Sequence, residues 1–182
     1  MILVLGMETK LSKTFLLILI LSGIIWFGGL HIRGIIGFDL LQMGTLDFKP
    51  NIHPYVERAV FNLIAQSSMV VGVAYIITWL AGIFYLITTP RRFKENGWLL
   101  MCTILFYLFT PVEIYTLVLD AKIWLLNFSG SNDLVEFRTL FIHRLAALSG
   151  VPTIALLCYY TAIVLAVFQP FRKSHCQELK IT

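Results

Sequence analysis

Three ionisable residues in or beside long apolar runs are the strongest candidates for chemistry: Glu113, His31 and His143. Burying a charge in a membrane is costly, so an ionisable residue there predicts a functional site. Glu113 follows Pro111 by two residues, and the backbone donor that proline removes allows a kink beside the carboxylate, which suits a ligand or proton site. Neutral imidazoles on separate helices can ligate haem iron, bind zinc or hydrogen-bond a quinone.

These residue types predict His31, His143 and Glu113 as cofactor-binding residues, with His31 and His143 as metal ligands. The expected cofactor is haem b or a quinone, and no catalytic residue is identified. The alternatives are structural: Glu113 could pair with an arginine or a hydroxyl that locks the helices, and the two histidines could be hydrogen-bonded side chains at the membrane interface. We expect His31 a few ångströms below that interface and His143 at or above it.

The elements that must position these residues are transmembrane helices. The chain of 182 residues is 58% hydrophobic and 13% charged, whereas soluble domains have about 45–50% and about 25%. This composition excludes a soluble enzyme, a disordered tail and a nucleic-acid-binding domain. Apolar runs without period-2 alternation favour helices over transmembrane strands. We predict an all-α integral membrane bundle in one domain, 1–182, with spans at about 14–34, 60–89, 97–119 and 145–169.

Basic residues orient the helices. With the amino terminus inside, eight lysines and arginines fall in inside segments and six in outside segments. The inside charges lie close to helix ends, including Arg91, Arg92 and Lys94 in a short loop, where the positive-inside rule is strongest. We predict a multi-pass protein of the inner (plasma) membrane with both termini cytoplasmic. The first apolar run is longer than a signal peptide's and lacks a small-residue cleavage site, so we expect it to remain as a helix.

This orientation collects titratable residues at the outer ends of the helices. Three of the four histidines, four arginines and several acids are placed there: His31, His53, His143, Arg33, Arg58, Arg138, Arg144, Glu57, Asp120 and Glu136. We therefore predict a polar site near the outer leaflet.

Small residues and prolines predict how the helices pack. Gly28 and Gly29 allow close approach of another helix or a flat ligand, and Ser68 with Gly72 forms a small-xxx-small pair. Pro152 is expected to bend the fourth helix, leaving 133–149 as an interfacial helix. The three cysteines form no C-x-x-C pair, which excludes a thiol oxidoreductase.

Several short motifs resemble the small four-helix bacterial inner-membrane proteins of the haem-binding protoporphyrinogen oxidase and copper-resistance membrane-domain type. The motifs are Trp26-Phe27-Gly28-Gly29-Leu30, Glu57-Arg58, Gly97-Trp98-Leu99, Val151-Pro152 and Gln169-Pro170-Phe171. The resemblance implies a four-helix bundle able to hold a flat cofactor. The oxidase's histidine and lysine are replaced here by Leu19 and Cys102, so the resemblance does not imply oxidase activity.

Three functions remain open from the sequence. The first is electron transfer through haem b or a quinone. The second is a non-catalytic accessory or assembly subunit of a larger membrane complex, with other membrane subunits or further copies of this chain as partners and no nucleic acid. The third is proton-coupled transport by an oligomer, for which Glu113 is the candidate proton site.

Overall fold

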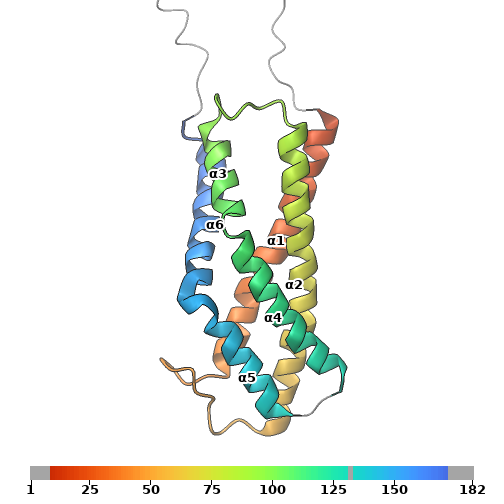
Figure 1. Ribbon diagram of the computed structural model, residues 1–182, viewed down its shortest axis with the longest axis vertical. Coiled ribbons are helices and arrows are strands. Elements are labelled where there is room, and N and C mark those ends of the chain that lie inside the picture. Colours follow the sequence, from red (N-terminus) through yellow and green to blue (C-terminus); the bar gives the residue numbers. More distant parts are fainter. Residues whose placement is uncertain (1–8, 131–132, 172–182) are drawn as a thin grey trace, which may run out of the picture. The chain divides into compact units, whose positions relative to one another are not determined.

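The computed structural model describes residues 9–130 and 133–171, leaving aside the side chain of residue 149. The described chain is helical, without a β-strand. Its elements, drawn in Figure 1, are α1 (Lys10–Asp39), α2 (Pro54–Thr88), α3 (Gly97–Tyr107), α4 (Thr110–Phe128), α5 (Leu134–Leu145), the short 3-10 helix η1 (Ala147–Gly150) and α6 (Val151–Phe168).

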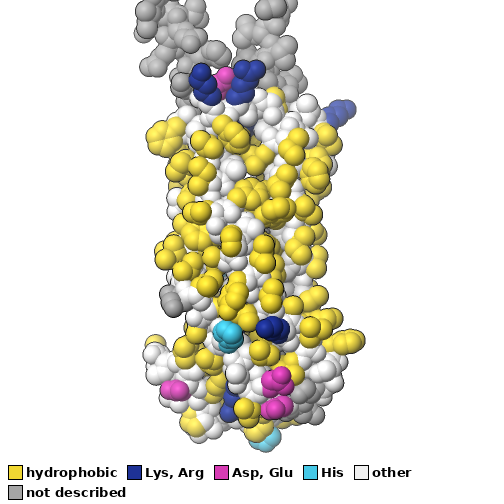
Figure 2. All heavy atoms as spheres, viewed as in Figure 1, with side chains coloured by type: hydrophobic (Ala, Val, Ile, Leu, Met, Phe, Trp, Pro, Cys, Tyr) yellow, Lys and Arg dark blue, Asp and Glu magenta, His cyan; other side chains and the backbone are white. Residues whose placement is uncertain are grey.

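Among the residues that the structure describes, four helical segments are long and apolar enough to cross a membrane: Lys10–Asp39, Pro54–Thr88, Gly97–Phe128 and Val151–Phe168. Hydrophobic side chains cover the visible face of the helices between their charged ends (Figure 2). The protein is therefore an all-α, multi-pass membrane protein, as the composition predicted.

The chain forms two compact units. Residues 9–89 and 115–147 make the first, called here the α1–α2 unit, which also contains most of α4 and all of α5. Residues 90–114 and 148–171 make the second, the α3–α6 unit, which contains the first turn of α4.

In the α1–α2 unit the two long helices pack along each other (Figure 1). Gly29 lies so close to Val71 of α2 that a Cβ atom at this position would overlap the valine side chain, whereas Gly28 has nothing within 4 Å. The hydroxyls of Ser22 and Thr78 lie 2.9 Å apart, a distance that allows a hydrogen bond between the helices. The predicted close approach at the glycines is confirmed for Gly29.

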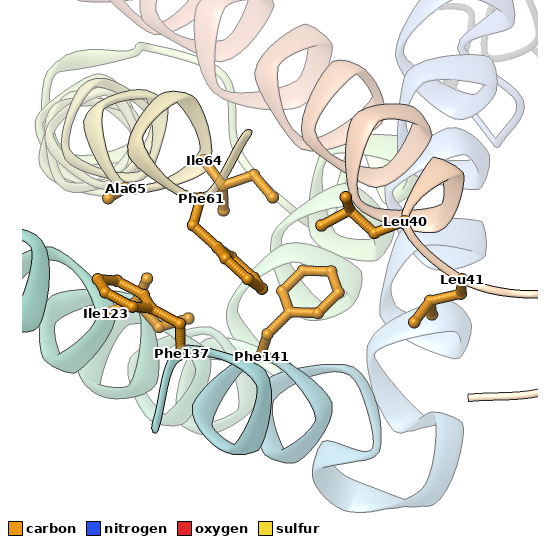
Figure 3. Close-up of a cluster of buried hydrophobic side chains, with 8 residues drawn as sticks. All are labelled: Leu40, Leu41, Phe61, Ile64, Ala65, Ile123, Phe137 and Phe141. Carbon is orange, nitrogen blue, oxygen red and sulfur yellow. The ribbon is translucent and has the colours of Figure 1, made fainter. Parts of the chain in front are cut away.

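The apolar core of this unit lies at the end where α1 finishes and α2 begins. The buried side chains drawn in Figure 3 come from α2, α4 and α5 and from the two residues that follow α1: Leu40, Leu41, Phe61, Ile64, Ala65, Ile123, Phe137 and Phe141. The rings of Phe61 and Phe137 stack at 5.4 Å between centroids. Gly37 leaves room for Phe141, whose ring would lie 2.7 Å from a Cβ atom there. These contacts attach α5 to α1 and α2.

In the α3–α6 unit, α3 packs against α6 (Figure 1). The Sγ of Cys102 donates to the carbonyl of Ala162 across the two helices, at 3.2 Å. Gly97, at the start of α3, is in close contact with Phe171 beyond the end of α6.

A bend was predicted at Pro111 and at Pro152, and at both positions the structure has a boundary between two helices. The third span is interrupted at Leu108 and Phe109, and a new helix, α4, begins at Thr110 with Pro111 in its first turn. The fourth span also starts afresh: Gly150 takes a positive φ of 90° as the N-cap of α6, and Pro152 lies in the first turn. Proline suits these positions because the first helical turn needs no backbone donor. The predicted interfacial segment contains α5, capped by Asp133.

Candidate functional site

One end of the α1–α2 unit holds a network of ion pairs. Asp120 of α4 is 4% exposed, and its Oδ1 accepts from Arg33 Nη2 of α1 at 2.6 Å and from Arg144 Nε of α5 at 3.1 Å. One buried carboxylate therefore joins three helices. Removing one partner of such a buried ion pair lowers the free energy of unfolding by roughly 3–5 kcal/mol, because the remaining charge is buried without a counter-charge.

A second ion pair connects α2 to α5. Glu57, 1% exposed, accepts two hydrogen bonds of 2.6 Å from Nε and Nη2 of Arg138. The hydrogen bond to Glu57 raises the pKa of Arg138, which keeps this guanidinium charged. The two-pronged geometry fixes the rotation of α5 on α2.

An amide network connects α2 to the carboxyl end of α4. Asn127 accepts from Arg58 Nη1 at 2.8 Å and donates to Asn62 Oδ1 at 3.0 Å, and Gln66 donates to the same oxygen at 3.2 Å. The guanidinium of Arg58 also lies over the Phe137 ring, 4.5 Å from its centroid. Much of the charge that the sequence gathers at this end thus binds α1, α2, α4 and α5 together.

His31 lies on α1 and is half-buried. Its Nδ1 is 2.7 Å from the carbonyl of Phe27, one turn earlier. A carbonyl only accepts, so Nδ1 donates this hydrogen bond. Such a bond to the backbone carbonyl is how metal-ligating histidines are commonly oriented.

His143 lies in the last turn of α5 and is exposed. Its Nε2 lies 3.3 Å from the hydroxyl of Tyr115 on α4, which is also exposed. If the tyrosine hydroxyl donates to Nε2, the imidazole proton is on Nδ1 and Nδ1 can donate elsewhere. If Nε2 donates to the hydroxyl oxygen, the hydroxyl proton can be donated elsewhere. In either tautomer the pair retains one donor for another acceptor.

Glu113 lies in the first turn of α4 and is 8% exposed. Its Oε1 accepts from the hydroxyl of Tyr159 on α6 at 3.0 Å. The rings of Phe106 and Phe109 lie around Tyr159 at 5.9 and 6.3 Å between centroids. Glu113 belongs to the α3–α6 unit, and both candidate histidines belong to the α1–α2 unit.

The fit to each expected cofactor can be tested on these contacts. Within residues 9–130 and 133–171, no group of three or more His, Cys, Asp or Glu side chains could hold a metal ion. Haem held by the predicted pair would use both histidines, and the hydrogen bond that orients His31 is compatible with this. At His143, however, iron binding through Nε2 would displace Tyr115. A quinone carbonyl fits better, because its oxygen could accept the hydrogen bond that Tyr115 and His143 can still donate.

Sequence reasoning allowed a hydroxyl as the partner of Glu113, but it did not identify which residues the candidates contact. Tyr115 is 28 residues from His143, and Tyr159 is 46 residues from Glu113. Tyrosines are common in membrane helices, so neither carries a sequence signal, and only the contacts of α4 with α5 and with α6 identify them.

An open hollow of about 620 Å³ lies at the loop that follows α1. Its lining includes Phe38, Leu41, Met43 and Lys49, and none of the three candidate cofactor residues contributes to it. The hollow is therefore separate from the predicted site.

Compared with protein-family models, curated proteins and solved structures, the chain matches none of them. The resemblance to small four-helix inner-membrane proteins stays a prediction from short motifs.

Proposed function

We propose that this membrane protein binds a quinone at the charged end of the α1–α2 unit and takes part in electron transfer. The observation that carries the proposal is the exposed pair of Tyr115 and His143. Tyr115 lies five residues before Asp120, which is about 7.5 Å along α4 towards the apolar part of the helix. A quinone head group dissolved in the membrane can therefore reach the pair from the apolar side. His31 is the further cofactor-binding residue of this proposal in the same unit, and Glu113, in the α3–α6 unit, would hold a proton.

Haem b is the alternative cofactor, which His31 and His143 would hold. It is less well supported because His143 Nε2 already contacts Tyr115. In both cases the ion pairs around Asp120 and Glu57 hold the helices that carry the histidines, and the bound group supplies the redox chemistry. We place the protein in the inner membrane with both termini in the cytoplasm, on the charge distribution alone.

The test is to purify the full chain in mild detergent, record its absorbance spectrum and extract its quinones. We expect co-purified quinone that falls several-fold in His143→Phe and in Tyr115→Phe. His53→Asn is the matched control, since His53 caps α2 through Tyr55 and asparagine also caps well. A wild-type sample without quinone and without a Soret band would refute both cofactor proposals.

An accessory role is the second candidate, and the pairing of the charges favours it. The carboxylates of Asp120 and Glu57 bind arginines of the same chain, as expected of structural locks. The test is native electrophoresis of mild detergent extracts. Migration in one defined complex with other membrane subunits, unchanged in His143→Phe, would support this role, whereas migration as the chain alone would contradict it.

A further inference from the structure

Arg58 is a half-buried cation in the first turns of α2. In the part of the chain that the structure describes, no carboxylate lies within ion-pairing distance of it. Its neighbour in the chain, Glu57, has both oxygens bound to Arg138. The direct partners of Arg58 are an amide oxygen, of Asn127, and an aromatic ring, of Phe137. Neither cancels a full positive charge.

The guanidinium retains donors. Nη1 donates to Asn127, and Nε is buried without a hydrogen-bond partner. Nη2 has no hydrogen bond to the described residues and is not among the buried atoms that lack a partner, so we infer that it is open to solvent or to a ligand. A ligand there must accept hydrogen bonds and carry negative charge, which describes a phosphate oxyanion.

The length of α2 gives the depth of this site. From Arg58 to Thr88 the helix rises about 45 Å, at 1.5 Å per residue. A bilayer measures about 40–45 Å when its head groups are included. If Thr88 lies at one head-group layer, Arg58 lies at the other, where phospholipid phosphates are found. The amides of Asn62 and Gln66 continue on the same face, one and two turns further into the membrane.

From these contacts we propose that Arg58 binds the phosphate of a membrane phospholipid. The site is independent of the quinone proposal, because it uses neither histidine. Phe137 holds the guanidinium from one side and Asn127 fixes its rotation, so the arginine is already oriented before the lipid arrives.

The first test uses the wild-type chain after delipidation in detergent. Thermal unfolding is followed with phosphatidylglycerol, with a diacylglycerol of the same acyl chains that lacks the phosphate, and with inorganic phosphate. We expect a higher melting temperature with phosphatidylglycerol alone. Equal melting temperatures with the two lipids would overturn the proposal, and equal stabilisation by inorganic phosphate would overturn the assignment to a lipid.

The second test compares Arg58→Gln with Lys122→Gln, which removes one exposed cation from α4 of the same unit. Bound phospholipid is counted by mass spectrometry under native conditions. We expect Arg58→Gln to lose the retained lipid and Lys122→Gln to keep it. A folded Arg58→Gln variant that retains as much lipid as wild type would overturn the proposal. If Arg58→Gln does not fold, the measurement on the wild-type chain decides alone.

Discussion

Asp120 is the residue on which the charged end of the α1–α2 unit depends most. A single oxygen of this carboxylate accepts from both Arg33 and Arg144. Both guanidinium groups are largely shielded, with side-chain exposures of 7% and 18%. An interaction of this kind stabilises a structure chiefly because breaking it is so costly.

We expect Asp120→Asn to destabilise the protein by about 3–5 kcal/mol, because two shielded cations lose their common counter-charge. Thermal or denaturant unfolding in detergent measures the loss. Asp39→Asn is the control, since Asp39 pairs with Lys49 at an exposed position, where such pairs contribute about 0–1 kcal/mol. Equal stabilities of the two variants would show that the Asp120 contacts contribute little.

Glu113 and Tyr159 form a separate buried pair. We expect Tyr159→Phe to cost about 1–3 kcal/mol, because the carboxylate loses a donor where water is scarce. Tyr55→Phe provides the comparison, since Tyr55 is 79% exposed and should tolerate the loss of its hydroxyl. Unfolding curves of both variants check this, and an unchanged Tyr159→Phe would mean that the hydrogen bond to Glu113 is dispensable.

At the scale of the elements, the two neighbouring glycines of α1 have opposite surroundings. A Cβ atom at Gly29 would overlap Val71 of α2, whereas one at Gly28 would meet nothing within 4 Å. Gly29 is therefore the position that allows α1 and α2 to approach closely.

This contrast gives a matched pair of variants. We expect Gly29→Ala to destabilise the protein by about 1–3 kcal/mol, through overpacking. Gly28→Ala should be neutral, or more stable by up to about 1 kcal/mol, because alanine favours the helix more than glycine does. Measuring the melting temperatures of the two variants side by side tests this prediction. A loss at Gly28 larger than that at Gly29 would contradict the contact with Val71.

The sequence predicted the helices well and their interruptions less well. Length and hydropathy identify a membrane helix without knowledge of its neighbours, which is why the four spans were found. The separate start of α6 depends on the positive φ of Gly150, a backbone conformation that hydropathy does not report. The interruption at Leu108 and Phe109 was expected as a kink at Pro111, because proline marks a break without giving its width.

At the scale of the whole molecule, the charge distribution makes the predicted orientation testable. In a cysteine-free background, Arg92→Cys and Asp47→Cys are treated in intact cells with a maleimide that does not cross the inner membrane. With both termini in the cytoplasm, residue 47 should react and residue 92 should be protected until the membrane is permeabilised. The reverse pattern would invert the orientation and place the charged end of the α1–α2 unit inside the cell.

The candidate site was predictable in its residue types but not in its pairings. The cost of burying a charge points to Glu113 and His31 from the sequence alone, whereas His143 is exposed on α5, outside the four apolar segments. That Asp120 contacts Arg33 rather than Lys122, two residues away, follows from the packing of α4 with α1, which leaves Asp120 buried and Lys122 exposed. Opposite charges gathered at one end of a set of helices allow many pairings, and only the packing selects among them.

The separation of Arg33 from Asp120 also has a consequence for biogenesis. The two residues are 87 positions apart in the chain. A ribosome adding about 5–20 residues per second needs roughly 4–17 s to make that interval. Throughout this time the nascent first helix carries an arginine at the bilayer edge without its eventual carboxylate, so a translocon, a lipid phosphate or an early partner must shelter it until α4 is inserted.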